Sequence, residues 1–117
     1  MFSRALVIAG FLSVLAAPAF ASAFHGFTVV NVPEGDVLNA RTGPGTAFAV
    51  QTAYPNGTGL SLTGICTDGL KLDDLGGLTQ GQKYAHVKTR WCQIWHDPQG
   101  GGAFTTGWVH GRFIYPH

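Results

Sequence analysis

Short segments in which hydrophobic and polar residues alternate follow one another along most of the chain, separated by turns rich in glycine and proline. A repeat of two residues is typical of a β-strand with one buried face, and beyond residue 23 no segment repeats with the period of a helix. The pattern predicts strands over residues 27–32, 37–41, 49–53, 60–66, 90–96 and 105–110, with residues 112–115 closing the chain. Short strands at this spacing predict a small all-β barrel or sandwich.

The same alternation predicts which hydrophobic side chains form the core, because successive residues of a strand point to opposite faces of the sheet. The side chains expected to be buried are Leu38, Val50, Leu60, Leu62, Ile94 and Val109. A helix longer than about three turns after residue 23 would contradict this architecture.

Two tight turns, TGPG at 42–45 and YPNG at 54–57, lie within residues 38–57, which read LNARTGPGTAFAVQTAYPNG. Glycine supplies positive φ in such turns and proline a fixed φ. This segment resembles the opening of bacterial SH3-like (SH3b) domains, and the segments WCQI and TTGWVH later in the chain resemble the pattern with which that family closes. The resemblance implies a small SH3-like barrel of short antiparallel strands with one long insertion loop.

The first residues predict an export signal rather than a part of the fold. An apolar run over residues 5–17 follows Arg4, and Pro18 and small residues follow the run. The alternative is a membrane anchor, but Pro18 and the alanines and serine after it leave less than the about 20 apolar residues that a span needs. We therefore expect residues 1–23 to be a cleaved signal and residues 24–117 to be the SH3-like domain, periplasmic or secreted, with no stable membrane insertion after cleavage.

The charge balance excludes two classes of partner. Without Arg4, the chain has equal numbers of basic and acidic side chains, and charged residues are few throughout. Binding to nucleic acid depends on a basic patch, and so does attachment to anionic lipid. Neither kind of partner is expected.

Cys66 and Cys92 are the two cysteines of the chain. In an oxidising compartment such a pair predicts a disulfide bond. The two residues end one predicted strand and begin the next, so the bond would join the ends of the intervening segment and stabilise the fold by about 3.5 kcal/mol on the chain-entropy model.

The segment between the cysteines, residues 67–89, is longer than the connection that the SH3b resemblance implies at this place. Loops of this length are usually functional or disordered. Two interpretations stay open: an elaborated surface loop with a short extra hairpin over residues 84–87, or a binding loop.

No catalytic or metal site is expected. The cysteines are used in the predicted disulfide, serine is scarce after residue 23, and the five histidines lack the close spacing of zinc ligands. A hairpin in which Trp95 faces Trp108 would place His96 opposite Gly107 and His110 opposite Gln93, too far apart to share an ion. We expect a protein that is not an enzyme and has no cofactor.

Aromatic residues are the stronger indication of binding, because tryptophan and tyrosine combine a stiff apolar ring with one hydrogen-bonding group, which suits peptide or sugar recognition. Alternation places Trp91, Gln93 and Trp95 on one face of their strand. We expect Trp91 and Trp108 to be structural and Trp95 to be more exposed. The candidate ligand-binding residues are Tyr54, Tyr84, Trp95 and Tyr115.

By resemblance, the function is expected to be that of a non-catalytic exported binding module that recognises a cell-wall peptide or an extended segment of an envelope protein. The alternative is a small disulfide-bonded structural or inhibitor-like accessory subunit of a larger envelope complex, which would present residues 67–89. A preformed groove with exposed aromatic residues favours the first function, and a protruding ordered insertion favours the second.

Overall fold

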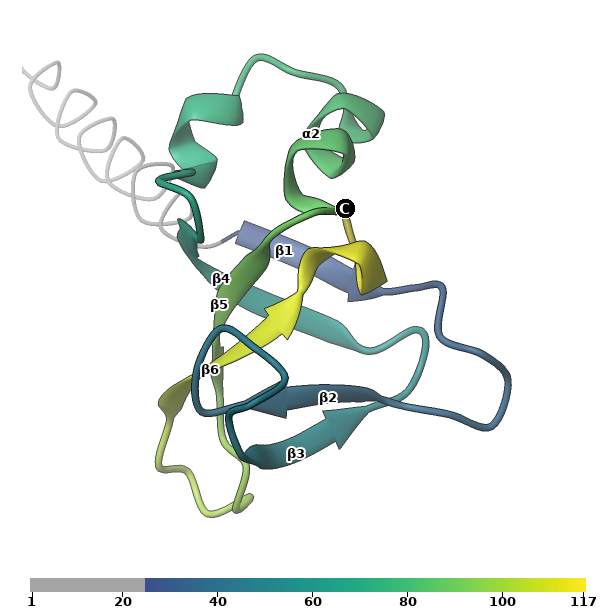
Figure 1. Ribbon diagram of the computed structural model, residues 1–117, viewed down its shortest axis with the longest axis vertical. Coiled ribbons are helices and arrows are strands. Elements are labelled where there is room, and N and C mark those ends of the chain that lie inside the picture. Colours follow the sequence, from purple (N-terminus) through teal and green to yellow (C-terminus); the bar gives the residue numbers. More distant parts are fainter. Residues whose placement is uncertain (1–24) are drawn as a thin grey trace, which may run out of the picture.

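The computed structural model describes residues 25–117 (Figure 1), so the predicted export signal lies outside the described residues. The strands form one antiparallel sheet in the order β3-β2-β6-β5-β4-β1-β7. They are β1 (His25–Val29), β2 (Leu38–Arg41), β3 (Val50–Tyr54), β4 (Gly59–Cys66), β5 (Trp91–His96), β6 (Thr105–His110) and β7 (Ile114–Pro116). The helical elements are η1 (Leu72–Leu75), α2 (Gln80–Val87) and η2 (Gly111–Phe113). The all-β prediction is confirmed as a mostly antiparallel sheet, with the addition of one α-helix.

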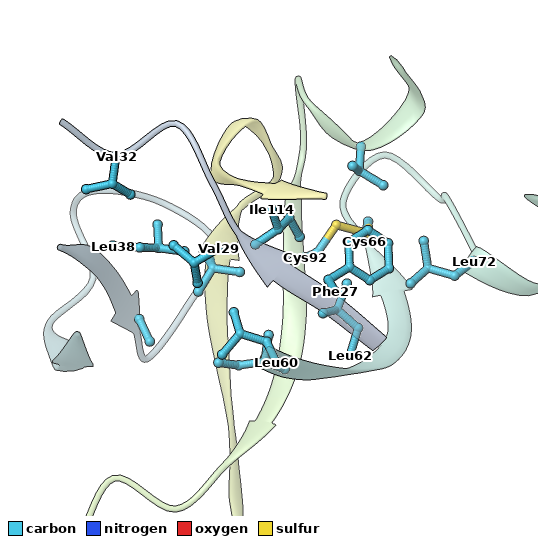
Figure 2. Close-up of a cluster of buried hydrophobic side chains, with 14 of the residues drawn as sticks. Phe27, Val29, Val32, Leu38, Leu60, Leu62, Cys66, Leu72, Cys92 and Ile114 are labelled. Atoms are coloured by element: carbon cyan, nitrogen blue, oxygen red, sulfur yellow. A yellow bond between two sulfur atoms is a disulfide. The ribbon is translucent and has the colours of Figure 1, made fainter. Parts of the chain in front are cut away.

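The hydrophobic core lies on the concave side of this sheet. Leu38 of β2, Val29 of β1 and Ile114 of β7 belong to one buried cluster, although β2 and β7 lie near opposite ends of the strand order (Figure 2). The sheet therefore curves around a single core. Its terminal strands, β3 and β7, pair on one side only, so the sheet is open.

Most of the predicted core residues are buried: Leu38, Leu60, Leu62, Ile94 and Val109. The prediction for Val50 is wrong, because this side chain is 49% exposed. Val50 begins the edge strand β3 opposite Arg41, at the point where the β2–β3 register shifts. A register shift displaces the alternation, and an edge strand has a neighbour on one side only, so Val50 turns outward.

The insertion, residues 67–89, is ordered and helical. Figure 1 shows it with η1 and α2 at one end of the sheet, opposite the β2–β3 hairpin. The expected hairpin over residues 84–87 is wrong, since these residues belong to α2. The helix begins at a capping box: the Thr79 hydroxyl accepts from the Gln82 N–H, and the Gln82 side chain accepts from the Thr79 N–H.

Three hydrophobic residues attach the insertion to the rest of the protein. Leu72 and Leu75 of η1 and Val87 of α2 are buried and belong to the core cluster. The cost of ordering the segment is offset by this burial. The insertion is therefore a part of the fold. Separately, no helix in the described part of the chain is long and apolar enough to cross a membrane.

The predicted disulfide bond between Cys66 and Cys92 is confirmed. The two residues lie directly opposite each other on β4 and β5, with an S–S distance of 2.05 Å, and both are buried. Beyond them, the Thr67 N–H donates to the Trp91 carbonyl (2.8 Å) and the Trp91 N–H donates to the Thr67 hydroxyl (3.0 Å). The base of the insertion is thus held by one covalent bond and two hydrogen bonds.

The β5–β6 hairpin has a different register from the expected one. Trp95 faces Thr106, Gln93 faces Trp108, and Trp91 faces His110. The expected register would have carried the ladder into Pro98, which has no N–H to donate. The chain instead leaves the ladder after His96, and the Asp97 carboxylate accepts hydrogen bonds from backbone N–H groups of the connecting loop.

Candidate functional site

A pocket of about 340 Å³ is lined by residues of the β1–β2 connection, β2, the β2–β3 loop, β5, β6 and η2. One wall is apolar and comes from the β1–β2 connection and the first residue of β2: Val32, Pro33, Val37 and Leu38. The floor is aromatic, with Trp91 of β5, His110 of β6 and Phe113 of η2. Asp36, Asn39, Arg41, Thr46 and Arg112 supply the polar groups. An apolar pocket with a few placed polar groups is the usual form of a ligand site.

The apolar wall is held in place by the side chain of Asn56. Its amide NH₂ donates to the Val32 carbonyl (2.7 Å), and its oxygen accepts from the Val32 N–H (3.1 Å). Just before Val32, Asn31 adopts a φ of 63° and donates to the Arg112 carbonyl (3.1 Å). The positive φ at Asn31 also explains why β1 ends earlier than predicted. These bonds join the β1–β2 connection to the β3–β4 turn and to η2, so the pocket is preformed.

The aromatic floor depends on a close approach between η2 and the end of α2. A Cβ atom at Gly111 would overlap the Val87 carbonyl oxygen, so only glycine fits there. With η2 in this position, the His110 ring meets Trp91 edge to face at 5.2 Å and Phe113 at 6.3 Å between centroids. Edge-to-face packing fixes the orientation of the rings relative to one another.

His110 contributes a neutral ring to the pocket. Its Nδ1 accepts a hydrogen bond from the Arg112 N–H (3.1 Å), which assigns the ring proton of the neutral form to Nε2. Burial lowers the pKa of His110, and the positive charge of Arg112 lowers the pKa further. At neutral pH the ring therefore offers an N–H donor and an apolar edge rather than a cation.

Two guanidinium groups supply the positive charge of the pocket. Arg41 donates from Nη1 to the carbonyls of Thr46 (3.1 Å) and Phe48 (3.0 Å), which fixes the loop over residues 42–49. The guanidinium of Arg112 lies over the Phe113 ring, 5.8 Å from its centroid. Neither arginine forms an ion pair with another residue of the described segment, where His25 pairs with Asp73. Both arginines remain able to bind a carbonyl or carboxylate group of a ligand.

The four residues predicted from the sequence to bind ligand do not form one site, although Tyr84 and Tyr115 are neighbours. Trp95 is 45% exposed, which confirms its expected exposure, and it lies on the outer face of β5. Tyr84 and Tyr115 face each other at 5.4 Å between centroids, and the Tyr84 hydroxyl donates to the Arg112 carbonyl (2.8 Å). These two tyrosines support η2 and lie outside the set of residues that lines the pocket.

Tyr54 belongs to a part-buried polar cluster that joins β3 to β5. Its hydroxyl donates to Nδ1 of His96 (2.9 Å), and the Nε2–H of His96 donates to the Gln51 side chain (3.0 Å). Burial lowers the pKa of His96, although the nearby Asp97 carboxylate opposes this shift. Burial also raises the pKa of Tyr54, as does Asp97. Both nitrogens of the neutral ring are satisfied, so this cluster fastens β3 to the core.

The sequence analysis missed the aromatic floor of the pocket. The sequence predicts a structural role for Trp91, and no pattern in it marks His110 or Phe113 as a binding residue. Alternation did place Trp91 on the outer face, opposite Cys92, and this signal indicated partial exposure. Within residues 25–117 no group of three or more histidine, cysteine, aspartate or glutamate side chains is placed to bind a metal ion.

Comparison with models of known protein families, with curated proteins and with solved structures yields no match for this chain.

Proposed function

We propose that the protein is a non-catalytic, exported SH3-like binding module whose pocket holds a cell-wall peptide or an extended segment of an envelope protein. The observation that carries this proposal is the preformed pocket with its aromatic floor of Trp91, His110 and Phe113. Its volume of about 340 Å³ is near the lower end of the range for ligand sites, which suits one or two residues of a longer chain.

The chemistry of the pocket matches an extended peptide. The apolar wall and the rings accept a side chain, and Arg112, Asn39 and the His110 N–H can bind the carbonyl groups on either side of it. A segment with few internal hydrogen bonds, such as a polyproline-like or glycine-rich peptide, presents its carbonyls to such donors.

Export and the SH3-like fold have separate support. The disulfide bond is of the kind that forms in an oxidising compartment. The antiparallel sheet that curves around one core, together with the sequence resemblance, supports the SH3-like barrel. The alternative function as an accessory subunit that presents the insertion has less support, because Leu72, Leu75 and Val87 of the insertion are used in the core.

The test is a titration of the isotopically labelled protein with soluble stem peptides released from peptidoglycan and, separately, with peptides from envelope proteins, monitored by NMR. The shifted amides should lie around the pocket. Trp91→Ala should weaken binding about ten-fold or more, the effect of removing a central aromatic anchor. Arg112→Glu, at an exposed position, reverses a charge at the rim without a cavity and should also weaken binding.

Trp95→Ala is the matched control, since Trp95 lies on the same strand but outside the pocket. It should leave peptide affinity unchanged. Shifts confined to η1 and α2, or equal losses in the Trp91 and Trp95 variants, would contradict the proposed pocket.

A further inference from the structure

All three tryptophans of the protein lie on the same face of the sheet. On β5 the residues Cys92 and Ile94 are fully buried, so Trp91 and Trp95 point outward. On β6 Val109 is fully buried, and Trp108 points outward opposite Gln93. Residues opposite each other in a sheet share a face. We call this surface, formed by Trp91, Trp108 and Trp95, the tryptophan face.

The register spaces these indoles evenly. Gln93 lies midway between Trp91 and Trp95, so Trp108, opposite Gln93, lies diagonally between the two. Each step of two residues along a strand covers about 7 Å, and the row therefore extends about 14 Å from the pocket at Trp91 to the exposed Trp95. Trp91 and Trp108 are half-buried and Trp95 is 45% exposed.

The side chains between the indoles are neutral and polar. Gln93 and Thr106 lie opposite Trp108 and Trp95, and Ser61 of β4 lies on the other side of Trp95. The Thr63 hydroxyl donates to the Gln93 side-chain oxygen (2.9 Å), which orients the Gln93 NH₂ group as a donor. Arg41, opposite Trp108, brings a positive charge beside the row, and it donates to two carbonyls of the 42–49 loop. This surface matches a ligand with hydroxyl groups and no charge.

The backbone beneath the row is not available to a ligand. β5 pairs with β4 on one side and with β6 on the other, and β6 pairs with β2 beyond. An extended peptide binds a sheet by adding a strand at a free edge, which exists here only at β3 and β7 among the described strands. A ligand on the tryptophan face is therefore recognised by ring stacking and by side-chain hydrogen bonds alone.

We infer that the tryptophan face binds a glycan strand of β-linked pyranoses. Pyranose rings with equatorial substituents have faces made of C–H groups, which stack on the indole rings, while their hydroxyls hydrogen-bond to Gln93 and Thr106. The side chains between the indoles carry no charge, so an anionic polymer would gain nothing from them; Arg41 beside Trp108 is the one charged residue paired with the row. This ligand is additional to the peptide of the pocket, and the two sites share Trp91 at their border.

The experiment measures the binding of chitohexaose and cellohexaose, both β-1,4-linked, by calorimetry and by NMR, with the α-linked maltohexaose as the comparison ligand. The β-linked hexamers should bind more tightly than maltohexaose and should shift amides of β5 and β6. Trp95→Ala should weaken binding about ten-fold or more, and Gln93→Ala by a few-fold. Because Trp95 is exposed, its removal leaves no cavity in the core.

Phe104→Ala provides the matched control, since Phe104 is 68% exposed but lies in the β5–β6 connection, off the tryptophan face. Its glycan affinity should equal that of the unmodified protein. Absence of binding to both β-linked hexamers, shifts outside β5 and β6, or an equal loss in the Phe104 variant would overturn the inference. If Trp95→Ala loses glycan binding but keeps its affinity for stem peptides, the test of the tryptophan face is independent of the test of the pocket. A Trp95-dependent dimer in place of glycan binding would overturn it too.

Discussion

At the scale of single residues, Gly111 shows how one missing side chain determines the pocket. Its Cα lies so close to the last turn of α2 that no Cβ fits, and the adjoining residues His110, Arg112 and Phe113 all line the pocket. Gly111 itself is buried and does not line the pocket.

Gly111→Ala is expected to destabilise the protein by about 1–3 kcal/mol, because the new methyl group must displace the backbone of Val87. Thermal unfolding measures the loss. Gly101→Ala is the control, since a Cβ there meets no atom within 4 Å and the variant should melt close to the unmodified protein. Equal melting of the two variants would contradict the close approach of η2 and α2.

Two histidines with lowered pKa values, His96 and His110, make the stability of the fold sensitive to acid. Their pKa values are lowered by burial in the folded protein, whereas the unfolded chain takes up a proton near pH 6.5. The unfolded state therefore binds more protons as the pH falls below about 6.5, and each residue can reduce stability by at most about 1.4 kcal/mol per pH unit.

The free energy of unfolding should accordingly fall between about pH 7 and about pH 5, measured by urea denaturation at each pH. His96→Gln should show a shallower fall than the unmodified protein, although it loses a hydrogen bond to Tyr54 or Gln51 and is less stable at pH 7. A stability that is constant or rises on acidification would exclude this account.

At the scale of elements, the disulfide bond and the insertion act together. Cys66 and Cys92 enclose a segment whose buried residues, Leu72, Leu75 and Val87, also pack on the core. The covalent bond fixes the ends of the segment, and burial of these three side chains fixes its middle.

Replacement of both cysteines by serine should lower the melting temperature by several degrees or more, because a bond across a sequence separation of 26 restricts the unfolded chain by about 3.5 kcal/mol. Protease should cut the insertion of this variant before the strands. The native protein should show no free thiol under denaturing conditions. Two free thiols, or an unchanged melting curve, would show that the fold does not depend on the bond.

The strands were predictable because each alternates over enough residues to distinguish two faces, and the disulfide bond followed from their ends. The helix α2 was not predictable from the sequence, since it is short, contains Gly81 and buries only Val87. Its one local signal was the capping box of Thr79 and Gln82. The predictions for Val50 and for the β5–β6 register were wrong for a related reason. An irregularity in the β2–β3 pairing displaces Val50, and Pro98 shifts the β5–β6 pairing. Alternation within one strand carries no information about how that strand pairs with its neighbour.

At the scale of the whole molecule, the pocket combines segments far apart in the sequence. The β1–β2 connection, β2, the β2–β3 loop, β5, β6 and η2 contribute to it, and Asn31 and Asn56 join the β1–β2 connection to η2 and to the β3–β4 turn. Sequence patterns identified aromatic residues as candidates for binding, and they predicted the exposure of Trp95. The choice between Trp91 and the tyrosines depended on the register and on the placement of η2, which are tertiary properties.

The pairing of β1 with β7 has a consequence for the order of the chain. Phe27 lies opposite Pro116, and the His117 N–H donates to the Gly26 carbonyl, so the two ends of the described chain are neighbours. A short linker could join them, and the chain could be opened between Gly100 and Gly101, in an exposed turn that belongs to no strand. Such a circular permutation would cut no ladder, and it would leave the pocket and the tryptophan face each on an unbroken set of strands.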